Sequence, residues 1–346
     1  MIVLGIESTA HTIGLGAVDD EGNILLNEWS TYIPPSGVGI HPREAAEHHV
    51  KAASELLRRA AAVIDLGKVS GVAFSQGPGL GPALRVGATI ARTLALRLGK
   101  PLIPVHHGVA HVEIARLATG AVDPLVLLVS GGHTMVLAHS GDRYRVFGET
   151  LDIAVGNCID MFAREAGFGF PGVPRVEECA AGGSRYIEMP YNVAGQDVYF
   201  AGIYTRAVEA LRRGERKEDV CLSFIETVYY MLAEVVERGL ALTGKRGLVV
   251  AGGVARSRRL VDIMRVAAEE FNASLHVVPH QLAGDNGAMI AWVGLLSLMS
   301  GVTARIEDST VRQRWRIDEV TTPWFDSSKA IISRRSAAEA MNPSND

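Results

Sequence analysis

Residues 8–15 read STAHTIGL and residues 130–137 read SGGHTMVL, so one pattern of strand, polar turn and strand occurs twice in this chain. Each stretch follows an apolar run, and each is followed by a polar loop, at 19–23 and 139–143, and another apolar run. Turns made of small and hydroxyl residues leave backbone N–H groups open, which suits a bound phosphate. The repeat therefore predicts two lobes that face each other across a nucleotide.

Composition and charge are those of an ordinary globular protein. The 346 residues are 48% hydrophobic and 21% charged, enough apolar material for one large or two medium domains. The net charge is −4, whereas a protein that binds nucleic acid unaided is usually basic. An RNA partner would therefore be held by local patches or by companion subunits. The candidate phosphate contacts, for which solubility and ion pairing are the simpler roles, are Arg85, Arg92, Arg97, Arg256, Arg258 and Arg259.

No feature of the sequence indicates a membrane or a secreted protein. The cysteines, Cys158, Cys179 and Cys221, have neither metal-binding nor disulfide spacing, which fits a reducing compartment. Residues 1–6 carry no basic leader or cleavage site. The longest apolar helix, expected over 286–300, is too short to span a bilayer. We expect a cytoplasmic protein without a membrane partner.

Strands alternate with helices along the chain, which predicts an α/β fold. After three strands, apolar residues at helical spacing predict a helix over 42–64. The second half repeats three strands over 124–147 before a set of helices. The predicted domains are an N-terminal lobe over 1–122, a C-terminal lobe over 123–324 with a helical insertion at about 156–243, and a mobile polar tail over 325–346.

The best metal-binding candidates are His107 and His111, which share one face if a helix runs through this segment. A third ligand must come from elsewhere, and Asp285 is the best candidate because a helix N-terminus tolerates a carboxylate well. Simpler roles exist for each residue, as a helix cap for Asp285 and as packing or surface for the histidines. Gly108 argues against a metalloprotease, since the HExxH motif needs glutamate there as general base.

Glycine pairs follow two apolar strands, in Ser130-Gly131-Gly132 and in Gly252-Gly253. The first resembles a phosphate-binding hairpin, and the second is a strand-to-helix turn whose backbone can approach a phosphate or nucleoside. Neither is a Walker loop or a dinucleotide fingerprint, and each by itself can serve merely as a tight turn. Asp160 and Glu177 are candidate partners for ribose or base, with helix surface as their alternative role.

Taken in order, these segments resemble the universal threonylcarbamoyl transferase family, which makes threonylcarbamoyladenosine in tRNA, and in particular its archaeal and eukaryotic branch. Each motif is weak by itself, whereas their order through nearly the whole chain is specific. The matching stretches are 5–12 (GIESTAHT), His107 with His111, 129–134 (VSGGHT), 148–157 (GETLDIAVGN), 160–164 (DMFAR), 252–255 (GGVA), 285–291 (DNGAMIA) and 311–320 (VRQRWRIDEV).

The resemblance implies a fold and a set of ligands. The fold would be two ribonuclease-H-like lobes of the actin, Hsp70 and sugar-kinase superfamily, with the ligand cleft between them. One metal ion, iron or zinc, would be held by His107, His111 and Asp285. The nucleotide, ATP, AMP or threonylcarbamoyl-AMP, would be contacted by Ser130, Gly131, Gly132, Asp160, Gly172, Glu177, Gly252, Gly253 and Ser257.

The resemblance also implies an activity: transfer of the threonylcarbamoyl group from threonylcarbamoyl-AMP to the exocyclic amine of the adenosine beside the anticodon, with release of AMP. The implied partners are tRNA and KEOPS-type subunits, namely a small kinase-like ATPase, a dimerising subunit and a tRNA-tail-binding subunit. Glu7 and His11 are weak candidates for a general base. The alternatives are a small-molecule kinase or a nucleotide-binding scaffold of the same fold and, third, a metalloprotease.

Four positions depart from the family pattern. Leu128 stands where certain archaeal relatives carry a tyrosine metal ligand, so the remaining coordination would come from water or substrate. Val173 replaces a usual glycine, Ser257 an asparagine that often contacts the nucleotide, and Ala201 a frequent serine. These changes bear on individual contacts and not on the family. The segment after Trp324 lies outside the resemblance.

Overall fold

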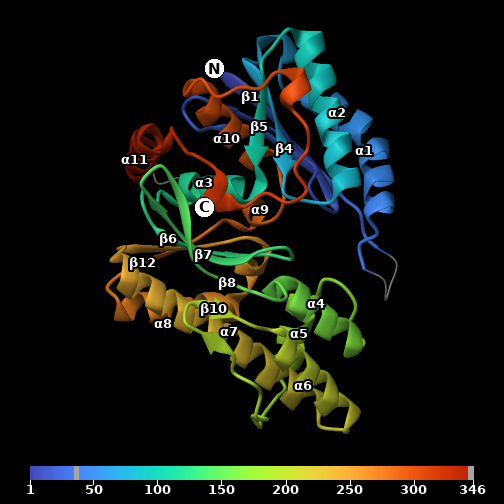
Figure 1. The fold of residues 1–346 in the computed structure, drawn as a ribbon, viewed down its shortest axis with the longest axis vertical. Coiled ribbons are helices and arrows are strands. Elements are labelled where there is room, and N and C mark those ends of the chain that lie inside the picture. Colours follow the sequence, from blue (N-terminus) through green and yellow to red (C-terminus); the bar gives the residue numbers. More distant parts are fainter. Residues whose placement is uncertain (35–38, 342–346) are drawn as a thin grey trace. The chain divides into compact units, whose positions relative to one another are not determined.

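The computed structural model describes residues 1–34 and 39–341, and the chain divides into two compact units (Figure 1). Unit 1 consists of Met1–Val122, Ser140–Tyr144 and the chain from Gly284 onward, and unit 2 of Asp123–His139 and Arg145–Ala283. The chain therefore returns to unit 1 at Gly284, whereas the sequence analysis put residues 123–324 in a single lobe. The reason is a helix near the C-terminus that packs on the N-terminal sheet.

Unit 1 is built on a five-stranded sheet of order β3-β2-β1-β4-β5. Its strands are β1 (Ile2–Glu7), β2 (Thr12–Asp19), β3 (Ile24–Thr31), β4 (Gly71–Gly77) and β5 (Leu102–His106). The first three are antiparallel, whereas β1, β4 and β5 run parallel, so their carboxyl ends lie at one edge of the sheet. Strand β4 is buried along its whole length, as expected for a central strand covered on both faces.

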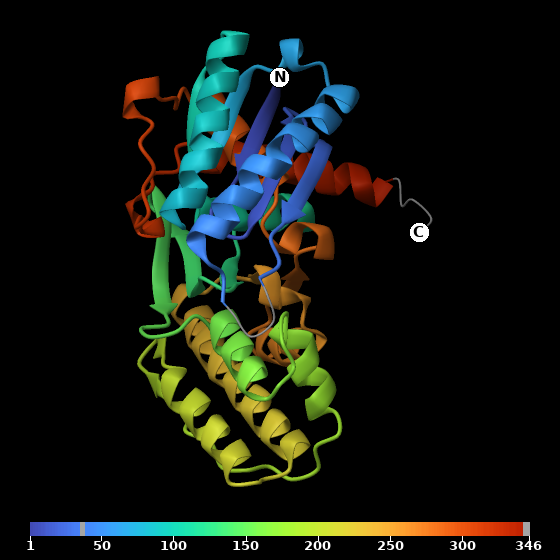
Figure 2. The same ribbon diagram turned by 90° about the vertical axis from the view of Figure 1, so that its right-hand side faces the viewer.

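Helices cover both faces of this sheet (Figures 1 and 2). On one face lie α1 (Pro42–Val63) and α2 (Gly81–Leu98), and on the other α3 (His107–Thr119) and α10 (Gly287–Met299). Helix α10 lies directly on the strand backbones: a Cβ atom on Gly5 would be 2.2 Å from the Ala291 nitrogen, and one on Gly287 would be 2.2 Å from the Gly16 nitrogen. Glycine is therefore required on both sides of this contact.

Unit 2 repeats the plan of unit 1 with a second five-stranded sheet, of order β12-β11-β6-β7-β8. Its strands are β6 (Leu125–Val129), β7 (Thr134–Ser140), β8 (Arg143–Glu149), β11 (Gly247–Ala251) and β12 (Ser274–Val277). Like β1 in the first sheet, β6 pairs antiparallel with the next strand and parallel with a later one. The predicted repeat of strand, turn and strand is confirmed as two sheets of the same topology.

The rest of unit 2 is mostly helical. Residues 155–243 include α4 (Val155–Glu165), α5 (Gly172–Ala180), the two-residue strands β9 (Val193–Ala194) and β10 (Asp197–Val198), α6 (Ala201–Arg212) and α7 (Lys217–Thr243). After β11 come a 3-10 turn, η2 (Gly253–Arg256), and α8 (Arg258–Glu270), and after β12 the short α9 (His280–Ala283). Helix α7 is apolar enough to be buried through most of its turns.

The segment beyond Trp324, predicted to be a mobile polar tail, begins as a well-packed helix, α11 (Phe325–Met341). Phe325 and Ile332 are 3% and 0% exposed. A buried network anchors the helix, because the Arg116 guanidinium donates to Glu113 Oε2 at 2.6 Å and to Ser328 Oγ at 3.1 Å. A few apolar residues at helical spacing therefore outweigh the polar composition of the tail.

Within the described residues, no helix is both long and apolar enough to cross a membrane.

Helix α1 contains an unusual buried residue, His49, which is fully shielded from solvent. Burial is the main cause that lowers its pKa to about 4, and the neighbouring His48 adds to the effect. The two Nδ1 atoms are 3.4 Å apart. His49 is therefore neutral in the folded protein at physiological pH.

We expect His49 to make the protein acid-sensitive. Because its pKa is about 4 when folded and about 6.5 when unfolded, the unfolded chain binds the extra proton between these values, and stability falls as the pH drops through this window. Between pH 7 and pH 4, the free energy of unfolding of the His49→Gln variant should fall by about 3 kcal/mol less than that of wild type. Urea unfolding across this range measures it, with the exposed His41→Gln as control. If the free energy of unfolding changed equally with pH in wild type and in His49→Gln, the prediction would be contradicted.

Candidate functional site

His107 and His111 are the first and fifth residues of α3, the helix that follows β5. His106 caps this helix by accepting a hydrogen bond from the Val109 nitrogen at 3.2 Å through Nδ1, so His107 begins the first turn. The His107 and His111 rings lie edge to face with centroids 4.6 Å apart. Both side chains are almost fully buried. The predicted shared helix face is therefore present.

Asp285 faces both histidines from the segment before α10. Its Oδ1 atom is 3.3 Å from His111 Nε2 and 3.6 Å from His107 Nε2. The helix cap is the next residue, Asn286, which accepts a hydrogen bond from the Met289 nitrogen at 3.0 Å. The simpler role considered for Asp285, a helix cap, is thus taken by its neighbour.

The spacing of these three donor atoms fits a metal ion. Asp285 Oδ1 is 3.3 and 3.6 Å from the two Nε2 atoms, and all three donors lie within 4.8 Å of one another. Donors about 2.0–2.1 Å from a tetrahedral or octahedral metal are roughly 2.8–3.4 Å apart, so small side-chain movements would complete the site. Two imidazoles and a carboxylate suit zinc as well as iron, and three protein ligands leave positions open for water or substrate. Leu128, one of the positions that depart from the family pattern, is fully buried in β6.

Glu7, at the end of β1, orients His107. Its Oε1 atom accepts hydrogen bonds from the Thr9 nitrogen at 2.6 Å and from Thr9 Oγ1 at 2.5 Å. Its Oε2 atom lies 3.0 Å from His107 Nδ1. When Nδ1 donates to Glu7, the lone pair of Nε2 is directed toward Asp285, the arrangement that metal-binding histidines need. Thr9 was not among the predicted site residues, although it lies in the same turn motif.

The charges of this cluster compensate one another. Burial opposes a charge on His107, but Glu7 and Asp285 outweigh it and raise its pKa to about 9. Burial lowers the pKa of His111, which stays neutral. Burial by itself would raise the pKa of Asp285, but His111 and His107 hold it well below its usual range. The proton on His107 thus supplies positive charge that a bound cation would replace.

The two candidates for a general base differ in their surroundings. Glu7 is fully buried and already bonded to Thr9 and His107, which makes it a positioning residue. His11 lies half-buried in the β1–β2 turn, close enough to Asp285 that its charge contributes to the lowered pKa of that carboxyl. His11 therefore stays a prediction, and Glu7 is poorly suited to receive a proton from a substrate.

In unit 2, the two predicted glycine turns lie at the carboxyl ends of β6 and β11. Ser130 Oγ accepts hydrogen bonds from the Gly132 nitrogen at 3.2 Å and the His133 nitrogen at 3.0 Å, which fixes the turn. A Cβ atom on Gly131 or Gly132 would meet nothing within 4 Å. The turn is therefore rigid but open to a ligand.

The second glycine turn lies against the first. Gly252 has a φ of +92°, and a Cβ atom there would be 2.3 Å from the Val129 carbonyl oxygen. The Gly156 nitrogen, in the first turn of α4, donates to the Ser130 carbonyl at 3.2 Å. Two glycine turns and a helix N-terminus therefore meet at one edge of the sheet, where backbone N–H groups can hold a phosphate.

The remaining predicted residues form two pairs. Asp160 Oδ1 accepts a hydrogen bond from the Gly172 nitrogen at 2.7 Å. Glu177 Oε1 accepts from the Tyr229 hydroxyl at 2.8 Å and from the Ser257 hydroxyl. Ser257 Oγ also accepts from the Leu260 nitrogen at 2.9 Å, so it caps α8. Over residues 1–34 and 39–341, Glu177 Oε2 makes no hydrogen bond, which leaves it open to a ribose hydroxyl.

Tyr229 is a member of this cluster that the sequence analysis missed. It lies in the apolar helix α7, where nothing in the local sequence separates it from core residues. Burial and the nearby Glu177 raise the pKa of its phenol well above the usual value, so it acts as a hydrogen-bond donor. Two departures from the family pattern also lie in unit 2: Val173 is half-buried at the start of α5, and the Ala201 nitrogen donates to Asp152 Oδ2 at 2.8 Å.

The six arginines proposed as phosphate contacts fall into two groups. Arg92 binds Ser309, Arg256 donates to the His280 carbonyl, and Arg259 pairs with Glu226. These three therefore have structural roles. Arg85, Arg97 and Arg258 are exposed and have no carboxylate partner among the residues that the structure describes.

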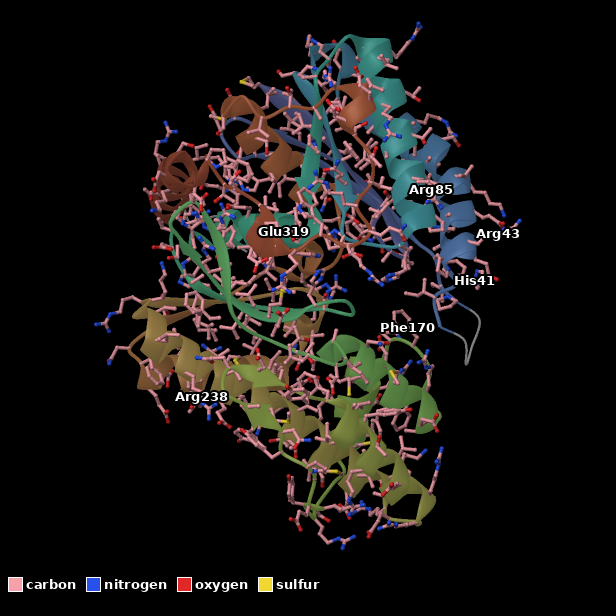
Figure 3. The ribbon with its side chains drawn as sticks, viewed as in Figure 1. His41, Arg43, Arg85, Phe170, Arg238 and Glu319 are labelled. Atoms are coloured by element: carbon pink, nitrogen blue, oxygen red, sulfur yellow. The ribbon has the colours of Figure 1, made fainter. Side chains whose placement is uncertain are left out.

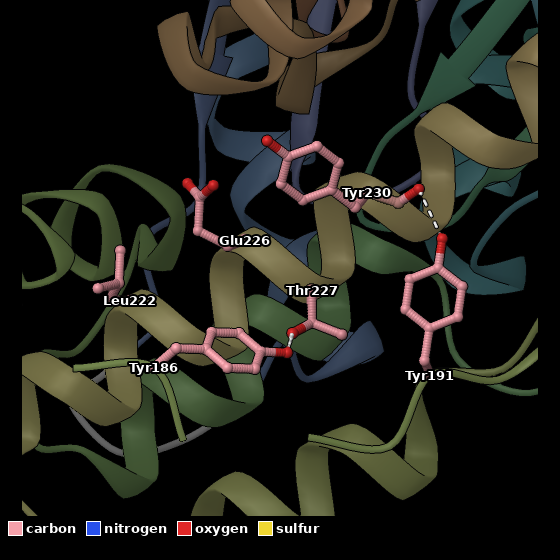
Figure 4. Close-up of a pocket in the computed structure, with 6 residues that line it drawn as sticks. All are labelled: Tyr186, Tyr191, Leu222, Glu226, Thr227 and Tyr230. Carbon is pink, nitrogen blue, oxygen red and sulfur yellow. Dashed lines mark hydrogen bonds between the residues drawn. The ribbon is translucent and has the colours of Figure 1, made fainter. Parts of the chain in front are cut away.

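A surface pocket of about 420 Å³ also lies in unit 2 (Figure 4). It is lined by Tyr186, Tyr191, Leu222, Glu226, Thr227 and Tyr230. The Tyr186 hydroxyl bonds to Thr227 Oγ1 at 2.6 Å, and the Tyr191 hydroxyl donates to the Tyr230 carbonyl at 3.1 Å. None of the predicted metal or nucleotide residues lines it, so the donor geometry, and not pocket size, locates the candidate site.

Comparison with known proteins decides the family. The family model for tRNA N6-adenosine threonylcarbamoyltransferase matches residues 23–292. The chain belongs to this transferase family. A tRNA N6-adenosine threonylcarbamoyltransferase from Caldivirga maquilingensis is 65% identical over 94% of the chain and 99% of its own length. The protein of that name from Pyrobaculum neutrophilum is 58% identical over 94% of this chain and 97% of its own. The resemblance stated from the motifs is thereby confirmed.

Solved structures agree with this transferase in fold alone. The HypF protein of T. kodakarensis has a TM-score of 0.62 and 14% identity, covering 89% of this chain and 49% of its own. The activator of the 2-hydroxyisocaproyl-CoA dehydratase from Clostridium difficile has a TM-score of 0.53 and 12% identity over 87% of this chain and 97% of its own. With the repeated sheet, these likenesses confirm the actin, Hsp70 and sugar-kinase fold class; a ligand cleft between its lobes stays a prediction.

We expect the transferase to bind one iron or zinc ion per chain. Replacing His111 by alanine removes one of the three converging donors, so its metal affinity should fall at least about 100-fold. Metal content after dialysis, measured by mass spectrometry, tests this. His41→Ala is the control, because His41 is exposed at the start of α1 (Figure 3). Retention of one metal ion by the His111→Ala variant would show that these residues are not the ligands.

The glycines of the two turns in unit 2 should respond differently to alanine. Gly252→Ala places a methyl group against the Val129 carbonyl at a positive φ and should cost at least about 2 kcal/mol of stability. Gly132→Ala meets open space and should stay within about 0.5 kcal/mol of wild type, yet weaken AMP binding about tenfold. Thermal unfolding and calorimetric titration with AMP measure both. Wild-type AMP affinity in Gly132→Ala would argue against this turn as the phosphate site.

Proposed function

We propose that this chain transfers the threonylcarbamoyl group from threonylcarbamoyl-AMP to the exocyclic amine of the adenosine adjacent to the anticodon in tRNA. The observation that carries this proposal is the 65% identity, over nearly the full length of both chains, to a relative named tRNA N6-adenosine threonylcarbamoyltransferase. The product of the reaction is a modified tRNA, and AMP is released. The fold alone would leave the reaction open, because it hosts many chemistries.

In this reaction the amine nitrogen forms a bond to the carbamoyl carbon, the bond from that carbon to the phosphate oxygen breaks, and the amine loses a proton. The leaving group carries the phosphate charge. The Ser130–Gly132 turn and the N-terminus of α4 beside it would hold this phosphate, because Gly131 and Gly132 leave the backbone of the turn uncovered. Glu177 and Asp160 would bind the ribose or base.

The metal site would contribute charge stabilisation and orientation to the reaction. When bound, an iron or zinc ion would act as a Lewis acid and orient the threonyl carboxylate or a phosphate oxygen. His107, His111 and Asp285 would supply its protein ligands. Glu7 would hold the Nδ1 proton of His107 and so keep Nε2 free to coordinate. Thr9 would fix Glu7 in turn.

We infer the partners from the net charge of the chain and from the name of one relative. With a net charge of −4, the chain is not expected to hold a tRNA alone, so we propose KEOPS-type companion subunits: a small kinase-like ATPase, a dimerising subunit and a tRNA-tail-binding subunit. A Methanothermobacter thermautotrophicus relative, 51% identical over 96% of this chain but only 62% of its own length, is named a probable bifunctional tRNA threonylcarbamoyladenosine biosynthesis protein. We place the protein in the cytoplasm, with its tRNA substrate.

The alternative functions lack a supporting observation. A small-molecule kinase or a nucleotide-binding scaffold gives the buried triad of His107, His111 and Asp285 no role. A metalloprotease needs a glutamate where Gly108 stands, and a Cβ atom there would already be 3.2 Å from the His106 ring.

The proposal predicts product formation in a reconstituted reaction. The chain is mixed with partner subunits, the adenylate-forming enzyme, threonine, bicarbonate, ATP and unmodified tRNA, and the digested tRNA is analysed by mass spectrometry. Wild type should form threonylcarbamoyladenosine, and His111→Ala should form at least about 100-fold less, because a ligand of the metal is lost.

Two other outcomes would change the conclusion. Equal product with wild type and His111→Ala would keep the transferase but remove the metal from its mechanism. No product with wild type, in a mixture where the Caldivirga maquilingensis relative is active, would contradict the proposed function. His41→Ala, an exposed histidine of the same unit, is the matched control.

A further inference from the structure

We propose that Val311–Arg316, an extended segment that we call the arginine strap, binds the sugar-phosphate backbone of the RNA substrate. The strap lies between η3 (Ile306–Asp308) and η4 (Ile317–Glu319) in unit 1. Arg312, Arg314 and Arg316 occupy alternate positions in it, and all three are exposed. This inference deepens the proposed function and rests on it for the identity of the RNA.

The backbone of the strap is fixed, although the segment has no regular secondary structure. The Arg312 nitrogen donates to the Gln76 carbonyl at 2.8 Å, and the Gly79 nitrogen donates to the Gln313 carbonyl at 3.2 Å. At its far end, His106 Nε2 lies 3.1 Å from the Trp315 carbonyl oxygen. Just before it, Arg92 Nε donates to Ser309 Oγ at 2.7 Å. Because its polar backbone groups bond to the body of unit 1, the strap presents its arginines on a rigid support.

Two of the three arginines are not neutralised. Arg312 lies over the Trp315 ring, with its guanidinium carbon 4.8 Å from the ring centroid, and Trp315 packs edge to face on His106. Over residues 1–34 and 39–341, neither Arg312 nor Arg314 has a carboxylate partner. Arg316 is different, because it pairs with Asp318 at 3.1 Å. Arg312 and Arg314 are therefore the residues available to an anion.

The strap lies beside the metal triad. His106, which holds its end, caps α3 immediately before His107. Gly79, which holds its middle, packs on Thr9, since a Cβ atom there would be 2.5 Å from the Thr9 carbonyl oxygen. Thr9 Oγ1 is itself 3.3 Å from His107 Nδ1. The segment that carries Arg312 and Arg314 is therefore held by residues that contact, or directly precede, a proposed metal ligand or its neighbour Thr9.

One more unpaired cation extends this surface. A Cβ atom on Gly81, the first residue of α2, would meet the Gln313 side chain at 2.5 Å, so α2 starts under the strap. Arg85 is one turn further on the same face of α2 and is exposed (Figure 3). The exposed Glu319, also labelled in Figure 3, lies just beyond the strap, in η4. The cationic surface therefore runs from Arg85 to Arg314.

An RNA backbone fits these features better than an acidic peptide does. Arginine forks bind phosphate oxygens with two hydrogen bonds, and guanidinium groups and aromatic rings such as those of Arg312 and Trp315 are planar surfaces of the kind on which RNA bases stack. Repeated phosphates spaced along a chain match cations at alternate positions of an extended strand. The nearby triad is also where the adenosine to be modified would have to be bound.

The test is tRNA affinity at several salt concentrations. Fluorescent tRNA is titrated with the reconstituted assembly of the chain and its partner subunits, containing wild type or the double variant Arg312→Gln, Arg314→Gln. The double variant should bind about tenfold more weakly at about 50 mM salt, and the slope of log affinity against log salt should decrease by about two, one for each phosphate that an arginine no longer neutralises. In the product assay, its KM for tRNA should rise about tenfold with the KM for threonylcarbamoyl-AMP unchanged.

The matched control is Arg43→Gln, Arg58→Gln, which removes the same charge from α1 of the same unit. These side chains are 82% and 72% exposed and are paired with Glu47 and Glu55. The control should keep the wild-type salt slope, and all proteins should share one thermal transition.

Equal tRNA affinities for the double variant and the control, including no binding by either, would overturn the proposal. Weaker binding to a partner subunit with tRNA affinity intact would also overturn it, since the strap would then be a protein-docking surface. A failure of the proposed function is distinguishable: wild type would then make no threonylcarbamoyladenosine, while the difference in tRNA affinity between the variants would still be measured.

Discussion

The close approach of α10 to the first sheet is the constraint on which the candidate site depends. Glycines at residues 5, 14 and 16 of the strands and at 287 of the helix let the two backbones meet, and any side chain there would collide with main-chain atoms. This packing carries a segment from the far end of the chain into unit 1. It thereby brings Asp285, which directly precedes α10, within 3.6 Å of histidines that are more than 170 residues earlier in the sequence. Without the glycine contact the three candidate metal ligands would not converge.

Burial sets the chemistry of this cluster. Charges that are withdrawn from water must be compensated, and here the protonated His107 does so for both carboxylates: its Nδ1 lies 3.0 Å from Glu7 Oε2 and its Nε2 lies 3.6 Å from Asp285 Oδ1. The neutral His111 contacts Asp285 at 3.3 Å. The same rule explains the C-terminal helix, where the buried Arg116 is neutralised by Glu113 and tied to Ser328. Because a metal cation would take the place of a proton in the first cluster, its electrostatics already match an ion. The second cluster serves to hold α11.

The two sheets share a topology but use glycine differently. In unit 1 glycine allows a helix to lie on the strands, whereas in unit 2 Gly252 allows one turn to lie on the neighbouring strand and leaves Gly131 and Gly132 uncovered. The uncovered glycines were predictable from the sequence, since a serine followed by two glycines after an apolar strand is typical of an anion-binding turn. The partners of Glu177 were not, because Tyr229 lies in an apolar helix and Ser257 lies 80 residues from Glu177. Likewise the helix that follows Trp324 was predicted as a mobile tail, because its few buried residues are scattered among polar ones.

The sequence by itself determined the repeated α/β pattern, the family and the identity of most candidate residues, because local periodicity and the order of short motifs survive without knowledge of contacts. The i and i+4 spacing of His107 and His111 likewise required a helix and nothing more. The tertiary structure decided the rest: that Asn286 and not Asp285 caps α10, that Glu7 is committed to His107, and that Arg312 and Arg314 lack a carboxylate partner among the described residues while Arg92 and Arg259 have structural contacts. These distinctions depend on which distant side chains meet, and hydrogen bonds and charge pairs act over a few ångströms of space, whatever the separation along the chain.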